Sequence, residues 1–255
     1  MFDVNYDFFL IENNFKEIEE VKSEKIQGDT SSKLPLVSIV IPTYKRVSTL
    51  RETLDSAIRQ TGNHNYEILV VDNNPERGDE TELLMAEYVS VKNLLYFKNT
   101  ANIGMAGNWS RCSELAHGEW VVLIHDDDLL VNNYLDEIEP CLINCVDGLF
   151  VCPKTFIDGE PLPTLNNSER MEIMKITLMY QYLFPILCAS GNALRKSKIL
   201  EYGGYTSKTY APDFFFSKMV YYSNVYMTNK SLIYYRKGLN AVSYTHLTLP
   251  TNSLV

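Results

Sequence analysis

Short apolar runs alternate with polar segments over residues 36–124, and each run has the length of a buried strand. Four such runs, rich in β-branched and aromatic residues, cover residues 36–41, 66–71, 94–97 and 120–124. Between them lie segments in which apolar residues recur at helical spacing, as Leu50, Leu54 and Ala57 do. Strands that alternate with helices in this way predict βαβ units and a largely parallel sheet.

Two local signals predict where elements of the first unit begin and end. Pro42 follows the first apolar run and cannot donate to a strand ladder, so we expect the strand to end there. Thr49 with Glu52 three residues later forms a capping-box pattern, which predicts a helix start. Further helices are predicted over residues 79–89 and after the loop at residues 99–107.

The second half of the chain is less regular. We expect a helix over residues 133–145, a strand at 149–152, an apolar helix from 168 to about 182, and a helix starting near Asp213. An apolar segment at 188–194 and strands at 225–228 and 232–236 complete the set, with a turn at the Gly203-Gly204 pair. We interpret this half as covering the open edge of the first.

Composition at the two ends sets the expected boundaries. Residues 1–33 mix apolar and acidic residues and then become polar, which predicts a short helical extension followed by a flexible joint. Residues 243–255 show neither periodicity nor charge, so we interpret 241–255 as an irregular, non-native tail. The remaining domain, 34–240, is expected to have a first half at 34–130 and a second half at 131–240.

Charge and cysteine content exclude several classes of protein. The formal net charge of -9, with 23 Lys and Arg, argues against binding to a nucleic-acid backbone. The five cysteines form no C-x-x-C pair and no ordered spacing with the four histidines, so neither a zinc site nor a disulfide framework is indicated. A reducing cytosol suits this composition best.

No segment has the pattern expected of a targeting signal or a membrane span. The N-terminal residues include Asp3 and Asp7, where a signal peptide has a basic region and an apolar core. The longest apolar stretch, residues 173–187, is interrupted by Lys175, Gln181 and Pro185 and is too short to span a bilayer. We favour a core or lid helix here over a membrane-surface contact.

Three consecutive carboxylates, Asp126, Asp127 and Asp128, follow the fourth predicted strand. Adjacent carboxylates repel one another unless water, backbone donors or a cation screens them. A hard divalent cation is the simplest reason to place them together, although a solvated acidic turn is the alternative. Because open α/β sheets carry their chemistry at the carboxyl ends of strands, the position favours a functional role.

The loop after the first predicted strand lacks the G-x-G-x-x-G pattern of a dinucleotide site. It offers instead the ring of Tyr44, suited to stacking on a base, and the cations Lys45 and Arg46, suited to phosphate oxygens. Asp72, at the end of the second strand, could accept hydrogen bonds from a ribose hydroxyl or a base edge. A turn-capping role for Asp72 is the structural alternative.

Four motifs in order together resemble the family 2 glycosyltransferases with the GT-A fold. They are Val-Ser-Ile-Val-Ile-Pro-Thr-Tyr at 37–44, Val-Val-Asp-Asn at 70–73, Asn-Ile-Gly at 102–104 and Leu-Ile-His-Asp-Asp-Asp-Leu-Leu at 123–130. The resemblance covers residues 36–236. It implies an α/β fold, a Rossmann-like, mostly parallel sheet flanked by helices, with a smaller mixed half on the acceptor side.

The same resemblance implies an inverting transferase of a hexose or a related sugar. The donor would be a nucleotide-diphosphate sugar, foremost a UDP-sugar, and the cofactor Mn²⁺ or Mg²⁺. The acceptor would be a glycan or a lipid-linked molecule in bacterial surface polysaccharide synthesis. The enzyme would work in the cytoplasm, with a peripheral contact at the inner face of the membrane. The resemblance indicates no oligomeric state.

Site residues carry over from the family by position in the motifs. His125 stands where relatives have the first Asp, so the resemblance makes Asp127 the first metal ligand and turns Asp126 toward the ribose or sugar. The implied nucleotide-binding residues are Pro42, Thr43, Tyr44, Arg46, Asp72, Asn102 and Asp126; the implied donor-sugar residues are Gly191 and Asn192; the implied metal ligands are Asp127 and Asp128.

Asp213 is the candidate general base, because it precedes an aromatic and apolar helix where the family carries an Asp. Transfer to a hydroxyl needs a carboxylate within hydrogen-bond reach of that hydroxyl. A first-turn Asp favoured by the helix dipole is the alternative. Two other functions stay open: a non-catalytic or truncated nucleotide-sugar binder, and a sugar nucleotidyltransferase, which would need a glycine-rich basic loop after the first strand.

Overall fold

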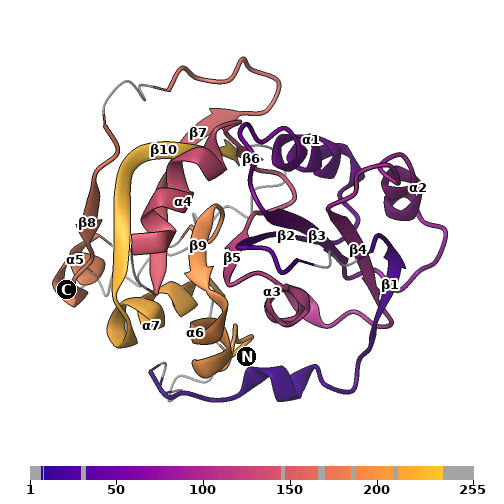
Figure 1. Ribbon diagram of the computed structural model, residues 1–255. Coiled ribbons are helices and arrows are strands. Elements are labelled where there is room, and N and C mark those ends of the chain that lie inside the picture. The colour runs from indigo at the N-terminus through magenta and orange to yellow at the C-terminus, as the bar shows by residue number, and fades with distance from the viewer. Residues whose placement is uncertain are drawn as a thin grey trace, which may run out of the picture.

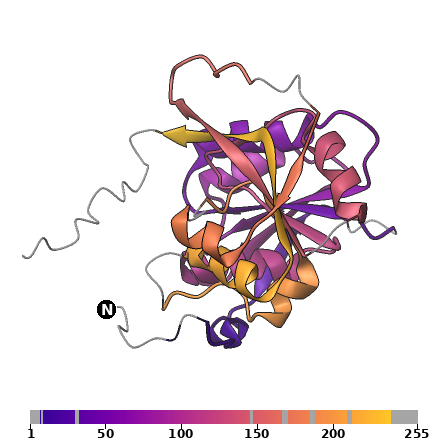
Figure 2. The same ribbon diagram turned by 90° about the vertical axis from the view of Figure 1, so that its left-hand side faces the viewer.

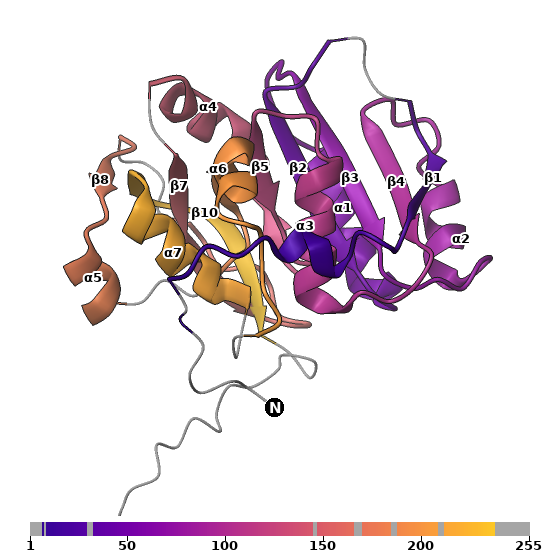
Figure 3. The ribbon, with the colours of Figure 1, turned by 90° about the horizontal axis from the view of Figure 1, so that it is seen from below.

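One twisted sheet of ten strands runs through the molecule, with helices on both of its faces (Figures 1 and 3). The computed structural model describes residues 7, 9–29, 33–144, 147–165, 170–184, 188–208 and 212–237. The strand order is β1-β4-β3-β2-β5-β9-β7-β10-β6, and β8 pairs with β10. Figure 2 looks along the sheet from the β10 side and shows the strands fanning as the sheet twists.

The first half is the predicted series of βαβ units. Its four central strands, β2 to β5, pair in parallel in the order β4-β3-β2-β5. The elements are β2 (Val37–Thr43), α1 (Val47–Ile58), β3 (Tyr66–Asp72), α2 (Glu80–Ala86), β4 (Leu94–Asn99), α3 (Gly104–Leu115) and β5 (Trp120–Leu123). The prediction of a mostly parallel α/β sheet is therefore confirmed.

Burial on both faces explains why these strands read as continuous apolar runs. Every residue of β2 is buried. Ile39 and Ile41 belong to one core cluster, and Val40 belongs to the other, on the opposite face of the sheet. Because side chains alternate between faces, a strand covered on both sides needs an apolar residue at almost every position.

β2 continues one residue past the predicted end at Pro42. The Val40 carbonyl accepts a hydrogen bond from the N–H of Ile124, which follows β5. Backbone polar groups of residues two apart on a strand point to the same side, so an N–H at position 42 would also face β5. The pairing of β2 with β5 ends at Val40, whereas its pairing with β3 continues to Thr43. Pro42 thus removes no ladder hydrogen bond.

The predicted capping box at the start of α1 is wrong. The helix begins at Val47, and its N-cap residue, Arg46, makes no side-chain capping bond. Thr49 donates its hydroxyl hydrogen to the Arg46 carbonyl, and Glu52 accepts a hydrogen bond of 2.5 Å from Arg236. Both side chains of the sequence pattern therefore have other partners.

The second half extends the sheet beyond β5. β9 pairs antiparallel with β5 and with β7, and β10 runs parallel to β7. The elements are β6 (Leu129–Leu130), α4 (Tyr134–Asn144), β7 (Gly148–Ile157), β8 (Ile173–Lys175), α5 (Leu178–Leu183), β9 (Asn192–Arg195), α6 (Lys196–Glu201), a 3₁₀ turn (Pro212–Phe214), α7 (Phe215–Tyr222) and β10 (Val225–Lys237).

Two predictions for this half need correction, and one helix was missed. The strands expected at 225–228 and 232–236 are one strand, β10, with register shifts between Met227 and Ile233. The helix expected from 168 to about 182 is replaced, among described residues, by strand β8 and the short helix α5. α6 was not predicted at all.

Most apolar side chains of α5 are exposed to solvent. Gln181, the polar residue of the helix, is buried and donates to the Ser217 hydroxyl of α7, whereas Met179 and Tyr182 are 66% and 83% exposed. The prediction of a core helix is therefore wrong, and the alternative of a lid helix stays a prediction. Within the described ranges, no helix has the length and apolar character needed to cross a bilayer.

Part of the predicted flexible joint is a strand, and the described residues 14–27 of the N-terminal segment contact the domain. Its 3₁₀ turn (Asn14–Glu17) lies beside α3, and β1 (Ser23–Gln27) pairs antiparallel with β4 (Figure 3). The Arg111 guanidinium of α3 donates to the carbonyls of Ile18 and Val21, and Asn14 donates to the Gly203 carbonyl. The predicted tail at 241–255 lies outside the described residues.

The contact at Gly203 gives a test of this attachment. Gly203 and Gly159 both have φ of +80°, but a Cβ at Gly203 would overlap the Glu12 carbonyl, whereas nothing lies near Gly159. Both alanine variants should lose about 1–2 kcal/mol through the left-handed backbone. We expect Gly203→Ala to lose roughly a further 1–3 kcal/mol through overpacking, measured by urea unfolding. Equal losses in the two variants would show that the segment is not held there.

Candidate active site

A cleft of about 420 Å³ lies beyond the carboxyl ends of β2, β3 and β5. Eight of the residues implied by the sequence line it: Pro42, Thr43, Tyr44, Arg46, Asn102, Asp126, Asp127 and Asp213. The other eight lining residues, to which sequence reasoning assigned no role in this site, are Asn73, Gly104, Met105, Asn108, Trp109, His125, Tyr235 and Arg236. The acidic triplet stands in the loop from β5 to β6, with the loop after β2 beside it.

Asp126 is held by the loop that follows β2. Its carboxylate accepts a hydrogen bond of 2.8 Å from the Thr43 hydroxyl, and the Arg46 guanidinium lies 3.4 Å away. Burial raises the pKa of Asp126 to about 6, against the lowering effect of Thr43 and Arg46. Asp126 is therefore a positioned acceptor at the cleft wall.

Asp127 is the member of the triplet that opens most to the cleft. Its side chain is 20% exposed, compared with 9% for Asp126 and 0% for Asp128. Arg46 donates to its Oδ2 at 2.6 Å. A ligand that approaches Asp127 thus meets one oxygen already paired with a cation and a second without a hydrogen bond from described residues.

Asp128 is fully buried behind the cleft wall. Its Oδ1 accepts a hydrogen bond of 2.9 Å from the backbone N–H of Arg236 in β10. Its Oδ2 has no hydrogen-bond partner among the described residues and lies 3.5 Å from the Nδ1 of His125. Leaving a buried carboxylate oxygen unpaired costs free energy, so this atom is a candidate ligand position.

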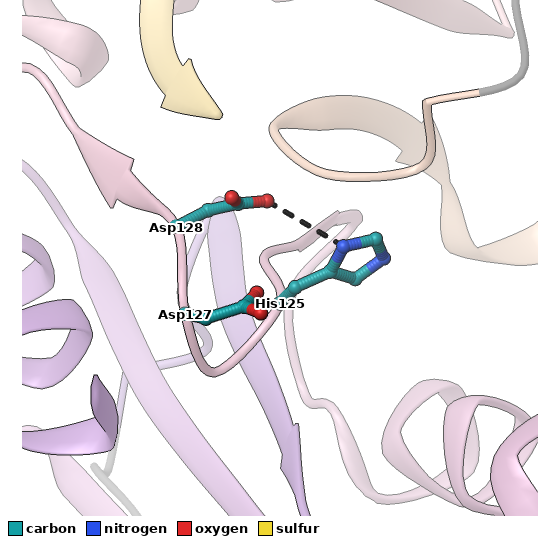
Figure 4. A group of neighbouring side chains, drawn as sticks. All are labelled: His125, Asp127 and Asp128. Atoms are coloured by element: carbon teal, nitrogen blue, oxygen red, sulfur yellow. Dashed lines mark ion pairs between the residues drawn. The ribbon is translucent and has the colours of Figure 1, made fainter. Parts of the chain in front are cut away.

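His125 lies over this unpaired oxygen (Figure 4). Its ring stacks on Trp109 of α3 at 5.2 Å between centroids, and its backbone N–H donates to the Ser190 hydroxyl. Burial lowers the pKa of the imidazole, but the carboxylates of Asp128, Asp213 and Asp127 outweigh it and raise the pKa to about 9. The ring is thus fixed between an indole face and a carboxylate.

Arg236 fastens β10 to the acidic loop. Its Nε donates to the Asp127 carbonyl at 2.7 Å, and its backbone N–H binds Asp128. The guanidinium pairs with the carboxylates of Glu52 and Asp158 and lies over the ring of Phe156. This one residue joins α1, β7 and β10 to the loop that carries the triplet.

Asp213 lines the cleft from the turn that precedes α7. The residue is 7% exposed, and its Oδ1 accepts a hydrogen bond of 3.2 Å from the Ala189 N–H rather than from a backbone group of α7. Burial raises the pKa of Asp213, while the charge of His125 lowers it. These contacts support a role in the cleft over a helix-capping role.

Asp72 does not line the cleft. Its carboxylate is fully buried and accepts hydrogen bonds from Lys98 at 2.7 Å and Tyr96 at 3.0 Å. Burial raises the pKa of Asp72, against the lowering effect of Lys98. Its neighbour Asn73 reaches the cleft instead and donates to the amide oxygen of Asn102. The nucleoside role expected of Asp72 therefore has no support from its contacts.

Gly191 and Asn192 are also buried and lie outside the cleft lining. The Gly191 N–H donates to the Leu123 carbonyl, and the Asn192 amide oxygen accepts from the Val151 N–H. Gly191 has φ of +80°, and a Cβ there would meet Ile233 at 3.0 Å. Their donor-sugar role stays a prediction, since these contacts are structural.

One group in the described part of the chain has donor atoms placed for a metal ion. Ligand atoms of His125, Asp127 and Asp128 all lie within 4.8 Å of one another. The unpaired Oδ2 of Asp128 fits a cation, and two carboxylates suit Mn²⁺ or Mg²⁺. His125, which the resemblance did not predict as a ligand, thus lies in the same group as the predicted ligands Asp127 and Asp128.

The geometry agrees with comparisons to known proteins. The sequence model "Glycosyl transferase family 2" matches residues 38–203. An uncharacterised glycosyltransferase of Rickettsia typhi is 30% identical over 158 residues, which are 60% of this chain and 46% of that protein. The O-antigen biosynthesis protein RfbC of Myxococcus xanthus is 32% identical over 127 residues, 49% of this chain and 10% of RfbC. The chain thus spans less than half of the length of these relatives.

Two solved structures share the fold. S. aureus TarS 1-349 in complex with UDP-GlcNAc has a TM-score of 0.64 at 20% identity, covering 79% of this chain and 58% of that one. The mannosyltransferase PcManGT from Pyrobaculum calidifontis, in complex with GDP-Man and Mn²⁺, has a TM-score of 0.60 at 16% identity, covering 90% and 63%. At these identities the likeness establishes the GT-A fold alone.

Proposed function

The chain belongs to glycosyl transferase family 2, and from this membership we propose that it transfers a sugar from a nucleotide-diphosphate sugar to an acceptor hydroxyl, with inversion and with a divalent cation. The observation that carries the proposal is the composition of the cleft. It brings together a carboxylate that could bind a metal ion (Asp127), a guanidinium that could bind phosphate (Arg46) and a buried carboxylate (Asp213).

Asp127 and Asp128 would hold the cation, which is Mn²⁺ or Mg²⁺. When bound, it neutralises the charge that develops on the departing diphosphate. Arg46 lies beside Asp127 and can add hydrogen bonds to the phosphate oxygens, since its guanidinium is one-third exposed. Protein and cation thus share the stabilisation of the leaving group.

Asp213 would serve as the general base. The acceptor oxygen attacks the anomeric carbon on the face opposite the diphosphate, its proton passes to the Asp213 carboxylate, and the bond from carbon to the phosphate oxygen breaks. The nucleoside diphosphate leaves, and the configuration at the anomeric carbon inverts. A buried carboxylate with a raised pKa is a stronger base than an exposed one, which suits this role.

Tyr44, Thr43 and Asn102 would contact the nucleoside, with Pro42 behind them and Asp126 facing the ribose or sugar. Tyr44 is 46% exposed, so its ring is accessible for stacking on a base. TarS structures contain UDP and UDP-GlcNAc, which supports a UDP-sugar as the first donor to test. The similarity to RfbC supports a glycan or lipid-linked acceptor in surface polysaccharide synthesis.

The two alternative functions have less support. A nucleotidyltransferase would use glycine-rich backbone to bind a triphosphate, and the loop at 43–46 has no glycine. A binder without catalysis would have no use for a buried carboxylate held over the cleft. Release of pyrophosphate from a nucleoside triphosphate would revive the first alternative, and tight UDP binding without turnover would favour the second.

Two variants separate the proposed roles. Asp127→Asn should lose Mn²⁺-dependent donor binding and at least about 100-fold in turnover, the scale seen when one transition-state contact is removed. Asp213→Asn should lose about 10²–10⁴-fold in turnover and keep donor binding, because only the proton acceptor is removed. Calorimetry and transfer assays with UDP- and GDP-sugars measure both effects. Glu160→Gln, in an exposed turn, is the control, and wild-type turnover in both site variants would sink the assignment.

We further propose that the protein acts in the cytoplasm and that α5 contacts the inner face of the membrane. The support is the set of exposed apolar side chains on this helix, among them Leu178, Met179 and Tyr182. Sedimentation with phosphatidylglycerol vesicles should retain the wild type and lose most of Tyr182→Ser. Leu83→Ser, which changes an exposed leucine of α2, is the control. Equal binding by all three proteins would contradict the contact.

A further inference from the structure

The group of possible metal ligands at the cleft wall contains a nitrogen donor as well as carboxylates. Figure 4 shows His125, Asp127 and Asp128 close together on the loop between β5 and β6, with a dashed line from Asp128 to the imidazole of His125. The resemblance to the family gave His125 no role, because relatives have an aspartate in its place. The structure brings a ring nitrogen of His125 within 4.8 Å of a carboxylate oxygen of each of the two predicted ligands.

The ion pair between His125 and Asp128 is longer than a usual direct hydrogen bond and is close to the separation of two ligands of one ion. Nδ1 and Oδ2 are 3.5 Å apart, beyond the usual 2.7–3.2 Å, and Oδ2 has no hydrogen bond to any described residue. Two ligands about 2.2 Å from one ion and at right angles to each other lie about 3.1 Å apart. A small closing of the pair would therefore let both atoms bind one cation.

The surroundings hold the ring in this position. The indole of Trp109 covers one face of the imidazole, at an interplanar angle of 28°. The His125 N–H is fixed to Ser190, and Asp128 is fixed through Oδ1 to the backbone of Arg236. Both side chains are thus oriented before any ligand arrives, which lowers the cost of binding.

We infer that His125 binds the divalent cation through Nδ1, together with Asp127 and Asp128, and that this nitrogen makes the site select Mn²⁺ over Mg²⁺. The inference rests on the proposed function and specifies its cofactor. Mg²⁺ favours an all-oxygen shell and gives up water reluctantly, whereas imidazole is a ligand that transition-metal ions accept. With an aspartate at position 125, all three ligands would be oxygens and the preference for Mn²⁺ over Mg²⁺ would be lost.

The direct test is pulsed electron paramagnetic resonance of Mn²⁺ bound to the full chain, with no donor or acceptor present. The wild type should show a hyperfine coupling to an imidazole ¹⁴N, which ¹⁵N-labelled histidine should change. His125→Asn, which keeps a polar side chain but has no imidazole, should lose the coupling. His117→Gln is the control, because His117 pairs with Glu67 outside the cleft lining and its loss should leave the coupling intact.

A second measurement tests the selectivity. The ratio of the Mg²⁺ to the Mn²⁺ dissociation constant should fall about tenfold in His125→Asp, which corresponds to roughly 1.4 kcal/mol. Thermal unfolding of each variant confirms that it folds. Bound Mn²⁺ without nitrogen coupling, or an unchanged ratio, overturns the role of His125 and leaves the proposed function standing. No Mn²⁺ binding by wild type, with or without UDP, overturns both.

Discussion

Three adjacent carboxylates can stand at the end of β5 because each one meets a different partner. Asp126 binds Thr43, Asp127 binds Arg46, and Asp128 binds the backbone of Arg236. Unpaired, such a group would be strongly destabilised by repulsion and by burial. The pairing depends on elements that are far apart in sequence, so the site forms only when the whole sheet does.

The sheet order supplies these partners. The strand order reverses between β2 and β5, because β3 and β4 lie on one side of β2 and β5 pairs with its other side. Such a position opens a cleft at the strand ends, where α/β proteins bind ligands. On the far side, the pairing of Tyr234 with Leu129 carries Arg236 to the acidic loop. The fold thus places one arginine from each half of the chain, Arg46 and Arg236, against the acidic triplet.

The parallel half could be predicted from the sequence because its strands are buried on both faces and therefore read as unbroken apolar runs. The capping box failed because Glu52 is bound by Arg236, which is 184 residues away along the chain. The burial of Asp72 against Lys98 likewise depends on a partner from another strand, and strand β8 forms by pairing with β10. Local patterns carry no information about such partners. His125 belongs to the motif, but the motif does not show that its ring lies 3.5 Å from Asp128.

The central claim is that this cleft holds a nucleotide sugar against a cation bound at the acidic loop. The most direct measurement is a crystal structure with Mn²⁺ and UDP, using anomalous scattering at the manganese absorption edge. The account predicts one anomalous peak at about 2.2 Å from an oxygen of Asp127, in contact with the diphosphate of UDP. UDP bound in the cleft without a peak there, or a peak at another group, would contradict it.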